Sequence, residues 1–369
     1  MSITQDLQAW YAQDHRDLPW RRTRDPYAIW ISEIMLQQTQ VATVIPYYER
    51  FMARFPGPAA LAEADEHDVL KHWEGLGYYS RARHLQAGAR MVQDHHGGLV
   101  PRTWDEVRRL PGVGDYTAGA ILSIAFGESV PAVDGNVIRV LSRIYLVTDD
   151  VAKPATRKHI EKLARELLVD AEPAVLNQAL MELGARVCTP AKPKCETCPV
   201  QQHCRAFAAG VAADLPYKPK KQAVKALTLA TVLVERGERF LLVRRPAEGV
   251  WGGLWALPSV ELPPTAGLDA QREALAASLK ALGVEALVGD QVQAHKHALT
   301  HRALTIPVFR AQFLAGAAPE GNTAWVHADE AKAYALPVPF QRIVAAIDPG
   351  PLFRAAEREN VSYMEGSPP

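Results

Sequence analysis

Two different patterns of apolar and polar positions divide the chain. Before residue 212, apolar residues recur at helical spacing, which predicts helices at residues 26–48, 116–126, 136–145, 161–168 and 175–187. After residue 226, short apolar runs at 227–234 and 239–244 flank a polar turn, as in a β-hairpin. Further strands are expected near residues 291–297, 303–313 and 324–327, with an amphipathic helix at 268–282. The sequence therefore predicts a multidomain protein, mainly α at first and α+β afterwards.

The boundary between these parts is marked by a change in composition. Residues 212–226 are rich in Pro and Lys, which is typical of an extended basic linker. We expect a helical domain at 1–211, an α+β domain at 227–348, and a polar, poorly ordered tail at 349–369. A chain of 369 residues is long enough for each domain to bury its own core.

Charge and hydropathy narrow the class of protein. The 41 basic and 41 acidic residues give a net charge of zero, so only local basic clusters could indicate a polyanionic partner. The sequence has no run of 18 apolar residues, and its first ten residues do not follow the signal-peptide pattern. We expect a cytoplasmic protein without membrane contact, which in a bacterium would lie with the nucleoid.

All four cysteines lie within 17 residues, with the spacing C-x6-C-x2-C-x5-C: Cys188, Cys195, Cys198 and Cys204. In a reducing compartment such clustering indicates a metal site rather than disulfides. Four thiolates could bind zinc or a four-iron, four-sulfur ([4Fe-4S]) cluster. Zinc usually uses two short C-x2-C knuckles, and the chain has one, so the uneven spacing favours the cluster.

The stretch at 110–143 carries the densest set of candidate residues. It begins with Leu-Pro-Gly-Val-Gly, in which Gly112 and Gly114 predict a tight turn before a helix. A helix N-terminus behind such a turn offers free N–H groups to a phosphate, although a plain αα-hairpin would have the same pattern. A second turn, between Pro131 and Gly135, carries the carboxylate of Asp134.

An acidic residue also interrupts an apolar segment, because Glu33 stands between Ile31 and Ile34. If this helix face is buried, the pKa of Glu33 should be raised, as a general acid at neutral pH requires. If the face is solvated, Glu33 has no such role, and spacing alone favours neither alternative. The uncharged polar block that follows can hydrogen-bond base edges: Gln37, Gln38, Thr39 and Gln40.

A second segment suited to nucleic acid lies at residues 73–83, WEGLGYYSRAR. Tyr78 and Tyr79 follow a glycine turn and precede Arg81 and Arg83. Aromatic rings beside cations can stack on bases and bind phosphates, although paired tyrosines after a turn are more often part of a core.

Taken together, these motifs resemble the MutY-type adenine DNA glycosylases of the helix–hairpin–helix superfamily. The resemblance is carried by the cysteine loop, the basic linker, a Nudix-like C-terminal part and the segments SEIMLQQTQVATVIPYY, WEGLGYYSRAR, LPGVGDYTAGAI and AVDGNVIRVLSR. It implies an enzyme that flips adenine, mispaired with 8-oxoguanine or guanine, out of duplex DNA and hydrolyses its N-glycosidic bond.

The resemblance also implies roles for individual residues. Glu33 matches the general acid that protonates N7 of adenine, and Asp134 matches the carboxylate that stabilises the oxocarbenium ion. Tyr116 and Asn136 match positions that support this pair. The remaining matches are a backbone-gripping hairpin, two duplex wedges, adenine-pocket residues and the ligands of one [4Fe-4S] cluster: Gly112, Gly114, Gln38, Tyr78, Arg21, Gln178 and the four cysteines.

The residue at position 116 distinguishes a glycosylase that only removes the base from one that also cleaves the strand. Endonuclease III-type enzymes have a nucleophilic lysine where Tyr116 stands, and tyrosine cannot form the Schiff base needed for strand cleavage. We therefore expect a monofunctional, monomeric glycosylase acting on mispaired duplex DNA. Two alternatives remain: a lyase acting on oxidised pyrimidines, and a non-enzymatic iron–sulfur DNA-binding protein.

The C-terminal part looks like a Nudix fold without hydrolase activity. Its box-like stretch at 272–278 has Glu273 as its only acid, and one carboxylate cannot assemble the magnesium site. Leu299, Thr300 and His301 align with the family's Phe-Ser-His loop that recognises 8-oxoguanine, and Leu299 replaces the aromatic residue. We expect this domain to recognise the oxidised base.

Overall fold

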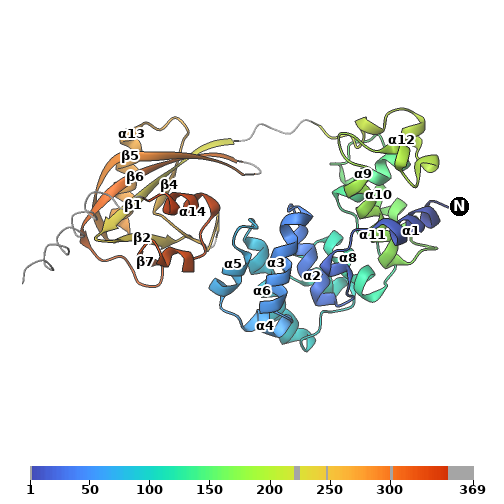
Figure 1. Cartoon of the computed structure of the whole chain (residues 1–369), viewed down its shortest axis with the longest axis horizontal. Coiled ribbons are helices and arrows are strands. Elements are labelled where there is room, and N and C mark those ends of the chain that lie inside the picture. The colour runs from blue at the N-terminus through green and yellow to red at the C-terminus, as the bar shows by residue number, and fades with distance from the viewer. Residues whose placement is uncertain (1, 220–224, 247, 300–301, 348–369) are drawn as a thin grey trace, which may run out of the picture. The chain divides into compact units, whose positions relative to one another are not determined.

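The computed structural model describes residues 2–219, 225–246, 248–299 and 302–347. The described residues divide into two compact units, one within Met1–His72 and Ser80–Lys221 and the other within Trp73–Tyr79 and Gln222–Pro369. The first is helical and the second is built on a β-sheet (Figure 1). The mainly α and α+β classes predicted for the two parts are confirmed.

Short helices connected by tight turns make up the first part of the chain. Four 3-10 turns accompany them: η1 (Pro19–Arg21), η2 (Cys195–Thr197), η3 (Gln201–His203) and η4 (Ala212–Asp214). The α-helices are α1 (Ile3–Asp14), α2 (Pro26–Leu36), α3 (Val41–Arg54), α4 (Pro58–Glu63), α5 (Glu66–Trp73), α6 (Ser80–His96), α7 (Trp104–Arg109), α8 (Asp115–Phe126), α9 (Gly135–Ile144), α10 (Pro154–Leu167), α11 (Pro173–Arg186) and α12 (Arg205–Ala208).

The continuous helical stripe expected at 26–48 was wrong. Helix α2 ends at Leu36 and α3 begins at Val41. Between them Gln38 adopts a left-handed backbone conformation with φ 58°, which no continuing right-handed helix contains. The polar block at 37–40 is therefore a turn that joins two helices.

Two glycines allow helices to approach the turn before α9 closely. A Cβ atom at Gly119 of α8 would clash with the carbonyl oxygen of Pro131. A Cβ atom at Gly184 of α11 would lie 2.6 Å from Cβ of Asn136. Because neither glycine has a side chain, α8 and α11 pack directly against the segment that carries Asp134.

The second unit is built on a seven-stranded sheet with the order β3-β2-β1-β6-β5, in which β4 also pairs with β1 and β7 with β2. The predicted hairpin at 227–244 is confirmed, because β1 and β2 pair antiparallel, while β1 and β6 run parallel. The strands are β1 (Lys225–Arg236), β2 (Arg239–Arg244), β3 (Trp255–Ala256), β4 (Ser259–Leu262), β5 (Val284–Ala298), β6 (Arg302–Gly316) and β7 (Thr323–Val326).

The two faces of this sheet carry separate cores, because alternate residues of a strand point to opposite faces. Helix α13 (Leu268–Ala281) packs Leu275 against one face, with Val232 of β1. Helix α14 (Val338–Ala345) packs Phe340 against the other, with Leu233 of β1, and the short turn η5 (Glu330–Ala333) belongs to the same core.

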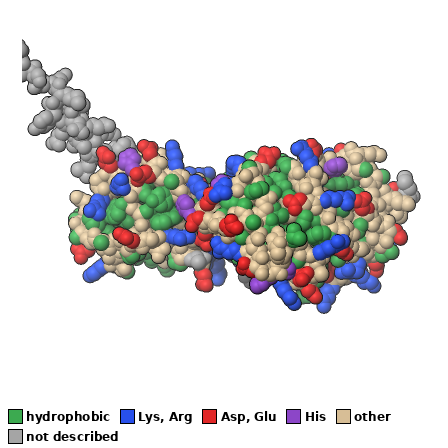
Figure 2. Space-filling model, turned by 90° about the horizontal axis from the view of Figure 1, so that it is seen from below, with side chains coloured by type: hydrophobic (Ala, Val, Ile, Leu, Met, Phe, Trp, Pro, Cys, Tyr) green, Lys and Arg blue, Asp and Glu red, His purple; other side chains and the backbone are tan. Residues whose placement is uncertain are grey.

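Some expectations fall on residues outside those described. Residues 220–224 of the expected linker and the expected tail at 349–369 are among them. Strand β1 begins at Lys225, so the last two residues of the expected linker already pair with β6. On the face shown in Figure 2, Lys and Arg side chains are interspersed with Asp and Glu side chains. Among the described residues, every helix is too short or too polar to cross a bilayer.

Candidate active site

A cavity of about 470 Å³ opens between η1, α2, α8, α11 and the N-terminus of α9. Its lining brings together residues from four distant stretches of the chain. Several candidate residues from the sequence line it: Glu33, Asp134, Tyr116, Asn136, Arg21, Gln37, Gln38, Thr39 and Gln178.

Glu33 lies on α2, which begins behind the N-cap of Asp25. The residue is only 5% exposed, and burial raises the pKa of its carboxyl to about 7, with the negative charge of Asp134 acting in the same direction. Of the two alternatives left by the sequence, the structure selects the buried one. Close to neutral pH, Glu33 is therefore able to hold or release a proton.

Tyr116, in the first turn of α8, is the direct partner of this carboxyl. Its hydroxyl donates to Oε2 of Glu33 at 2.5 Å and lies 3.1 Å from Sδ of Met181. Burial raises the pKa of Tyr116 well above 10, and the neighbouring Glu33 raises it further. The tyrosine therefore stays neutral while it hydrogen-bonds the ionised form of Glu33.

Asp134 is the N-cap residue of α9. Its carboxylate accepts hydrogen bonds from the backbone N–H of Val137 at 2.8 Å and from Nδ2 of Asn136 at 2.7 Å. Burial raises the pKa of Asp134, but these two donors favour the ionised form and oppose the rise. The two carboxyls of the cavity thus have different surroundings, one mainly desolvated and one held by donors.

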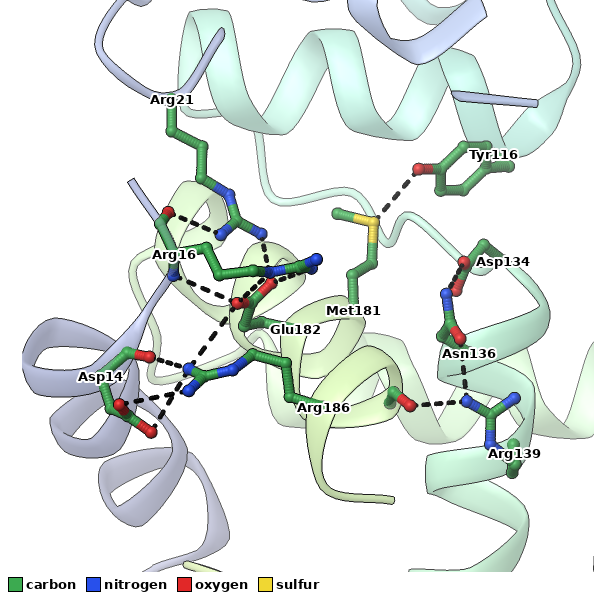
Figure 3. Close-up of polar contacts among 11 residues, drawn as sticks. Asp14, Arg16, Arg21, Tyr116, Asp134, Asn136, Arg139, Met181, Glu182 and Arg186 are labelled. Atoms are coloured by element: carbon green, nitrogen blue, oxygen red, sulfur yellow. Dashed lines mark hydrogen bonds and ion pairs between the residues drawn. The ribbon is translucent and has the colours of Figure 1, made fainter. Parts of the chain in front are cut away.

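Asn136 is itself held from behind. Its Oδ1 accepts from Nη2 of Arg139 at 2.8 Å, and the same guanidinium donates to the carbonyl oxygens of Gly184 and Cys188, both at 2.7 Å. A single arginine therefore connects the turn that holds Asp134 to α11 and to the first cysteine. Figure 3 shows the contacts that run from Asp134 through Asn136 to Arg139.

An ion-pair cluster at the cavity wall was not predicted. Glu182 of α11 is fully buried and accepts from Arg16 at 2.7 Å and from Arg21 at 2.8 Å, and Arg186 lies 3.8 Å away. Burial alone would raise the pKa of Glu182, but the hydrogen bonds from Arg16 and Arg21 outweigh it and lower the pKa to about 2. Figure 3 shows the guanidinium groups of Arg16 and Arg21 directed at this carboxylate, while Arg186 also pairs with Asp14. Its spacing of four residues from Gln178, one helical turn, was the available signal.

Other predicted residues lie outside the cavity lining. Tyr78 is 43% exposed and has a positive φ of 49°. Gly112 has φ 77°, as the tight turn requires, and Gly114 is the N-cap of α8, where no side chain caps the helix. Leu299 is described in the turn between β5 and β6, whereas Thr300 and His301 lie outside the described residues.

The four cysteines line a second, largely apolar cavity formed with α9 and the end of α11. Burial, together with the other three cysteines, raises the pKa of Cys198 to about 11, so these thiolates need a cationic partner to ionise together. The buried Arg143 donates to Sγ of Cys188 at 3.3 Å and to the carbonyl oxygens of Thr189 and Pro190.

Across the described parts of the chain, no three His, Cys, Asp or Glu side chains are close enough to share one metal ion. In a four-iron cluster each thiolate binds a different iron, so the ligands stand further apart than around a single ion. The shared cavity and the all-thiol donor set therefore fit such a cluster.

Comparisons with known proteins identify the family of each part of the chain. A model of HhH-GPD superfamily base excision DNA repair proteins matches residues 31–166, and a NUDIX domain model matches 229–346. The chain is 42% identical over 313 residues to the adenine DNA glycosylase of Mus musculus, covering 70% of this chain and 61% of the mouse protein. The human adenine DNA glycosylase is 39% identical over 378 residues, covering 86% of this chain and 67% of the human protein.

A solved thermostable thymine-DNA glycosylase superposes with a TM-score of 0.51 and 31% identity, covering 56% of this chain and 95% of that chain. The chain thus spans less than two thirds of the mouse protein and two thirds of the human one. On the extent and identity of these matches, the chain belongs to the adenine DNA glycosylase family, with a helical HhH-GPD domain followed by a Nudix-like domain.

Proposed function

We propose that this protein is a base excision repair enzyme that removes adenine mispaired with 8-oxoguanine or guanine in duplex DNA. The observation that carries the proposal is the pairing of two unlike carboxyls in one cavity, a desolvated Glu33 and a donor-held Asp134. The family relatives bear the name adenine DNA glycosylase.

In this reaction Glu33 transfers its proton to N7 of the flipped adenine. The electrons of the N-glycosidic bond then go to the leaving base, and the sugar becomes an oxocarbenium ion. Asp134 stabilises the positive charge at C1′. Water adds there and gives up a proton to the carboxylate left on Glu33, which restores the acid and completes the hydrolysis. Tyr116 stabilises the carboxylate that remains on Glu33, and Asn136 keeps Asp134 in place.

One set of residues binds the extruded base, and another binds the duplex around it. Arg21 and Gln178 contact the extruded adenine. Gln38, Thr39 and Tyr78 contact the duplex beside the opposite base, and the Gly112–Gly114 turn with the start of α8 binds a backbone phosphate. The thiolates of Cys188, Cys195, Cys198 and Cys204 would hold one [4Fe-4S] cluster, which would order the loop that docks on DNA.

Each domain has one task in this proposal. Residues 1–211 carry out excision, 212–226 link the domains, and 227–348 recognise 8-oxoguanine through Leu299, Thr300 and His301. Glu273 is the only acid at 272–278, so the Nudix-like domain does not hydrolyse nucleotides. The enzyme acts as a monomer on the bacterial nucleoid and, lacking a lysine at Tyr116, leaves an intact abasic strand.

The test is single-turnover cleavage of a duplex with one A·8-oxoguanine pair, with and without alkali after the reaction. We expect strand breaks only after alkali, and none with Glu33→Gln. Breaks without alkali would mean a lyase. A duplex with an oxidised pyrimidine tests the endonuclease III-type alternative, and release of that base with no release of adenine would refute the proposal.

A further inference from the structure

The turn between α2 and α3 holds an exposed side chain in an unfavourable backbone conformation. Gln38 has φ 58°, a region that residues other than glycine, asparagine and aspartate rarely adopt. Among the described non-glycine residues, Tyr78, Leu146 and Trp251 also have positive φ. Such strain persists only where neighbouring contacts hold the chain in place, so the contacts of this turn decide how Gln38 is presented.

A buried arginine supplies those contacts. Arg81, in the first turn of α6, is 7% exposed. Its Nη1 donates to the carbonyl oxygens of Ile34, Met35 and Gln37 at 2.8, 2.9 and 2.6 Å. Its Nη2 donates to Oγ1 of Thr39 at 3.2 Å.

Two of these acceptors, the Gln37 carbonyl and the Thr39 hydroxyl, belong to the residues on either side of Gln38. The carbonyls of Ile34 and Met35 belong to the last turn of α2, where helical carbonyls do not accept from an N–H four residues on. The Ile34 carbonyl also accepts from the backbone N–H of Gln37 at 3.3 Å. A guanidinium there also satisfies the negative end of the helix dipole. By bonding the carbonyl before Gln38 and the side chain after it, Arg81 fixes both ends of the strained residue.

We infer that Arg81 is a positioning residue that holds the 37–39 turn ready to enter the duplex. It does not touch DNA or the reacting atoms. Instead it fixes the backbone from which Gln38 projects, so the protein does not have to order this turn during binding. The inference rests on the proposed function, because it assigns the turn to the duplex beside the opposite base.

The experiment compares Arg81→Met with Gln86→Met in the full-length protein. Gln86 is a matched control because it lies on the same helix, is 2% exposed, and bonds the carbonyl oxygens of Leu61 and Ala64 at the end of α4. Both variants remove a buried side chain that caps a helix C-terminus. Only Arg81 bonds the turn at 37–39.

The primary readout is the dissociation constant for a matched duplex divided by that for an A·8-oxoguanine duplex with uncleavable 2′-fluoro-adenosine. A high ratio means strong preference for the mispair. We expect Arg81→Met to lower this ratio about tenfold, which corresponds to about one hydrogen bond to a charged group. Gln86→Met should lower the thermal unfolding temperature similarly and change the ratio less than about twofold. Arg81→Lys, which keeps the charge, should restore part of the ratio.

Equal ratios for Arg81→Met and Gln86→Met would overturn the inference while leaving the proposed function intact. If Arg81→Met does not fold, Arg81→Lys decides alone: a reduced ratio supports the inference, and a wild-type ratio overturns it. If the wild-type protein neither prefers the A·8-oxoguanine duplex nor excises adenine from it, the proposed function fails and the inference fails with it.

Discussion

Replacing Tyr116 with Phe should move the alkaline limit of adenine excision to higher pH. Burial raises the pKa of Glu33 to about 7, and the hydrogen bond from Tyr116 is the main contact that opposes this rise. The hydroxyl stabilises only the ionised carboxylate, so its removal makes the proton harder to lose. Because the proposed mechanism needs protonated Glu33, the Tyr116→Phe enzyme should keep its rate to higher pH, even if its maximum rate is lower.

The size of the shift follows from the strength of that bond. A hydrogen bond to a charged group contributes about 1.5–3 kcal/mol. One pKa unit corresponds to about 1.4 kcal/mol, so the alkaline limb should move by about one to two pH units. Titration of Tyr116 itself does not complicate the wild-type profile, since burial holds its pKa well above 10.

Single-turnover excision rates measured from about pH 5 to about pH 10 would give both limbs of the profile. Met181→Leu is the control, because it removes the sulfur that lies 3.1 Å from the tyrosine hydroxyl and leaves the bond to Glu33 intact. Its alkaline limb should coincide with that of the wild type. A limb that stays in place or moves to lower pH in Tyr116→Phe would refute the assignment of Glu33 as the titrating acid.

Three further changes test other parts of the structure. The folded-state pKa of Glu33, about 7, lies above its ordinary value of 4.5. The contribution of Glu33 to the free energy of unfolding is therefore fully present below pH 4.5 and is lost as pH rises through about 7. Urea unfolding should therefore show Glu33→Gln to be more stable than wild type by up to about 3 kcal/mol at alkaline pH. A difference between the two proteins that is the same at acidic and alkaline pH would contradict this. Gln38→Gly should raise the free energy of unfolding by about 1 kcal/mol and weaken mispair binding, and a loss of stability would show that the left-handed backbone is not strained. Gly119→Ala should lower the free energy of unfolding by about 3 kcal/mol or more, because its Cβ meets the carbonyl of Pro131. Gly57→Ala is the control, because Gly57 has open space around it. Equal losses in the two variants would argue against close packing at Gly119.

The burial of Glu33 could have been predicted from the composition of its helix. Nine of the eleven residues of α2 are buried, so the helix is apolar on every side rather than on one stripe. A helix that is hydrophobic all round belongs in a core, and a carboxyl within it is desolvated whichever way it faces. The spacing of apolar residues on one helix face does not decide whether Glu33 is buried. The absence of any second charged residue in the helix does indicate burial.

Other parts of the site depend on pairings that no local pattern contains. Arg16 and Glu182 are 166 positions apart, and Arg81 lies 44 positions from Gln37. Each of these residues alone is typical of a solvated helix face, and only the fold brings them together. The resemblance to a family supplied Tyr116 and Asn136, whose contacts to Glu33 and Asp134 the structure shows directly.

The electrostatics of the cavity depend on the one carboxylate that was not predicted. Arg21 lines the same cavity as Glu33, and its positive charge lowers the pKa of Glu33. An uncompensated pair of guanidinium groups there would favour the ionised acid and deprive the enzyme of its proton at neutral pH. Glu182 accepts hydrogen bonds from both Arg16 and Arg21 and, with its pKa lowered to about 2, remains ionised to balance them. In the proposed mechanism, Arg21 can therefore face the extruded base while desolvation continues to hold the proton on Glu33.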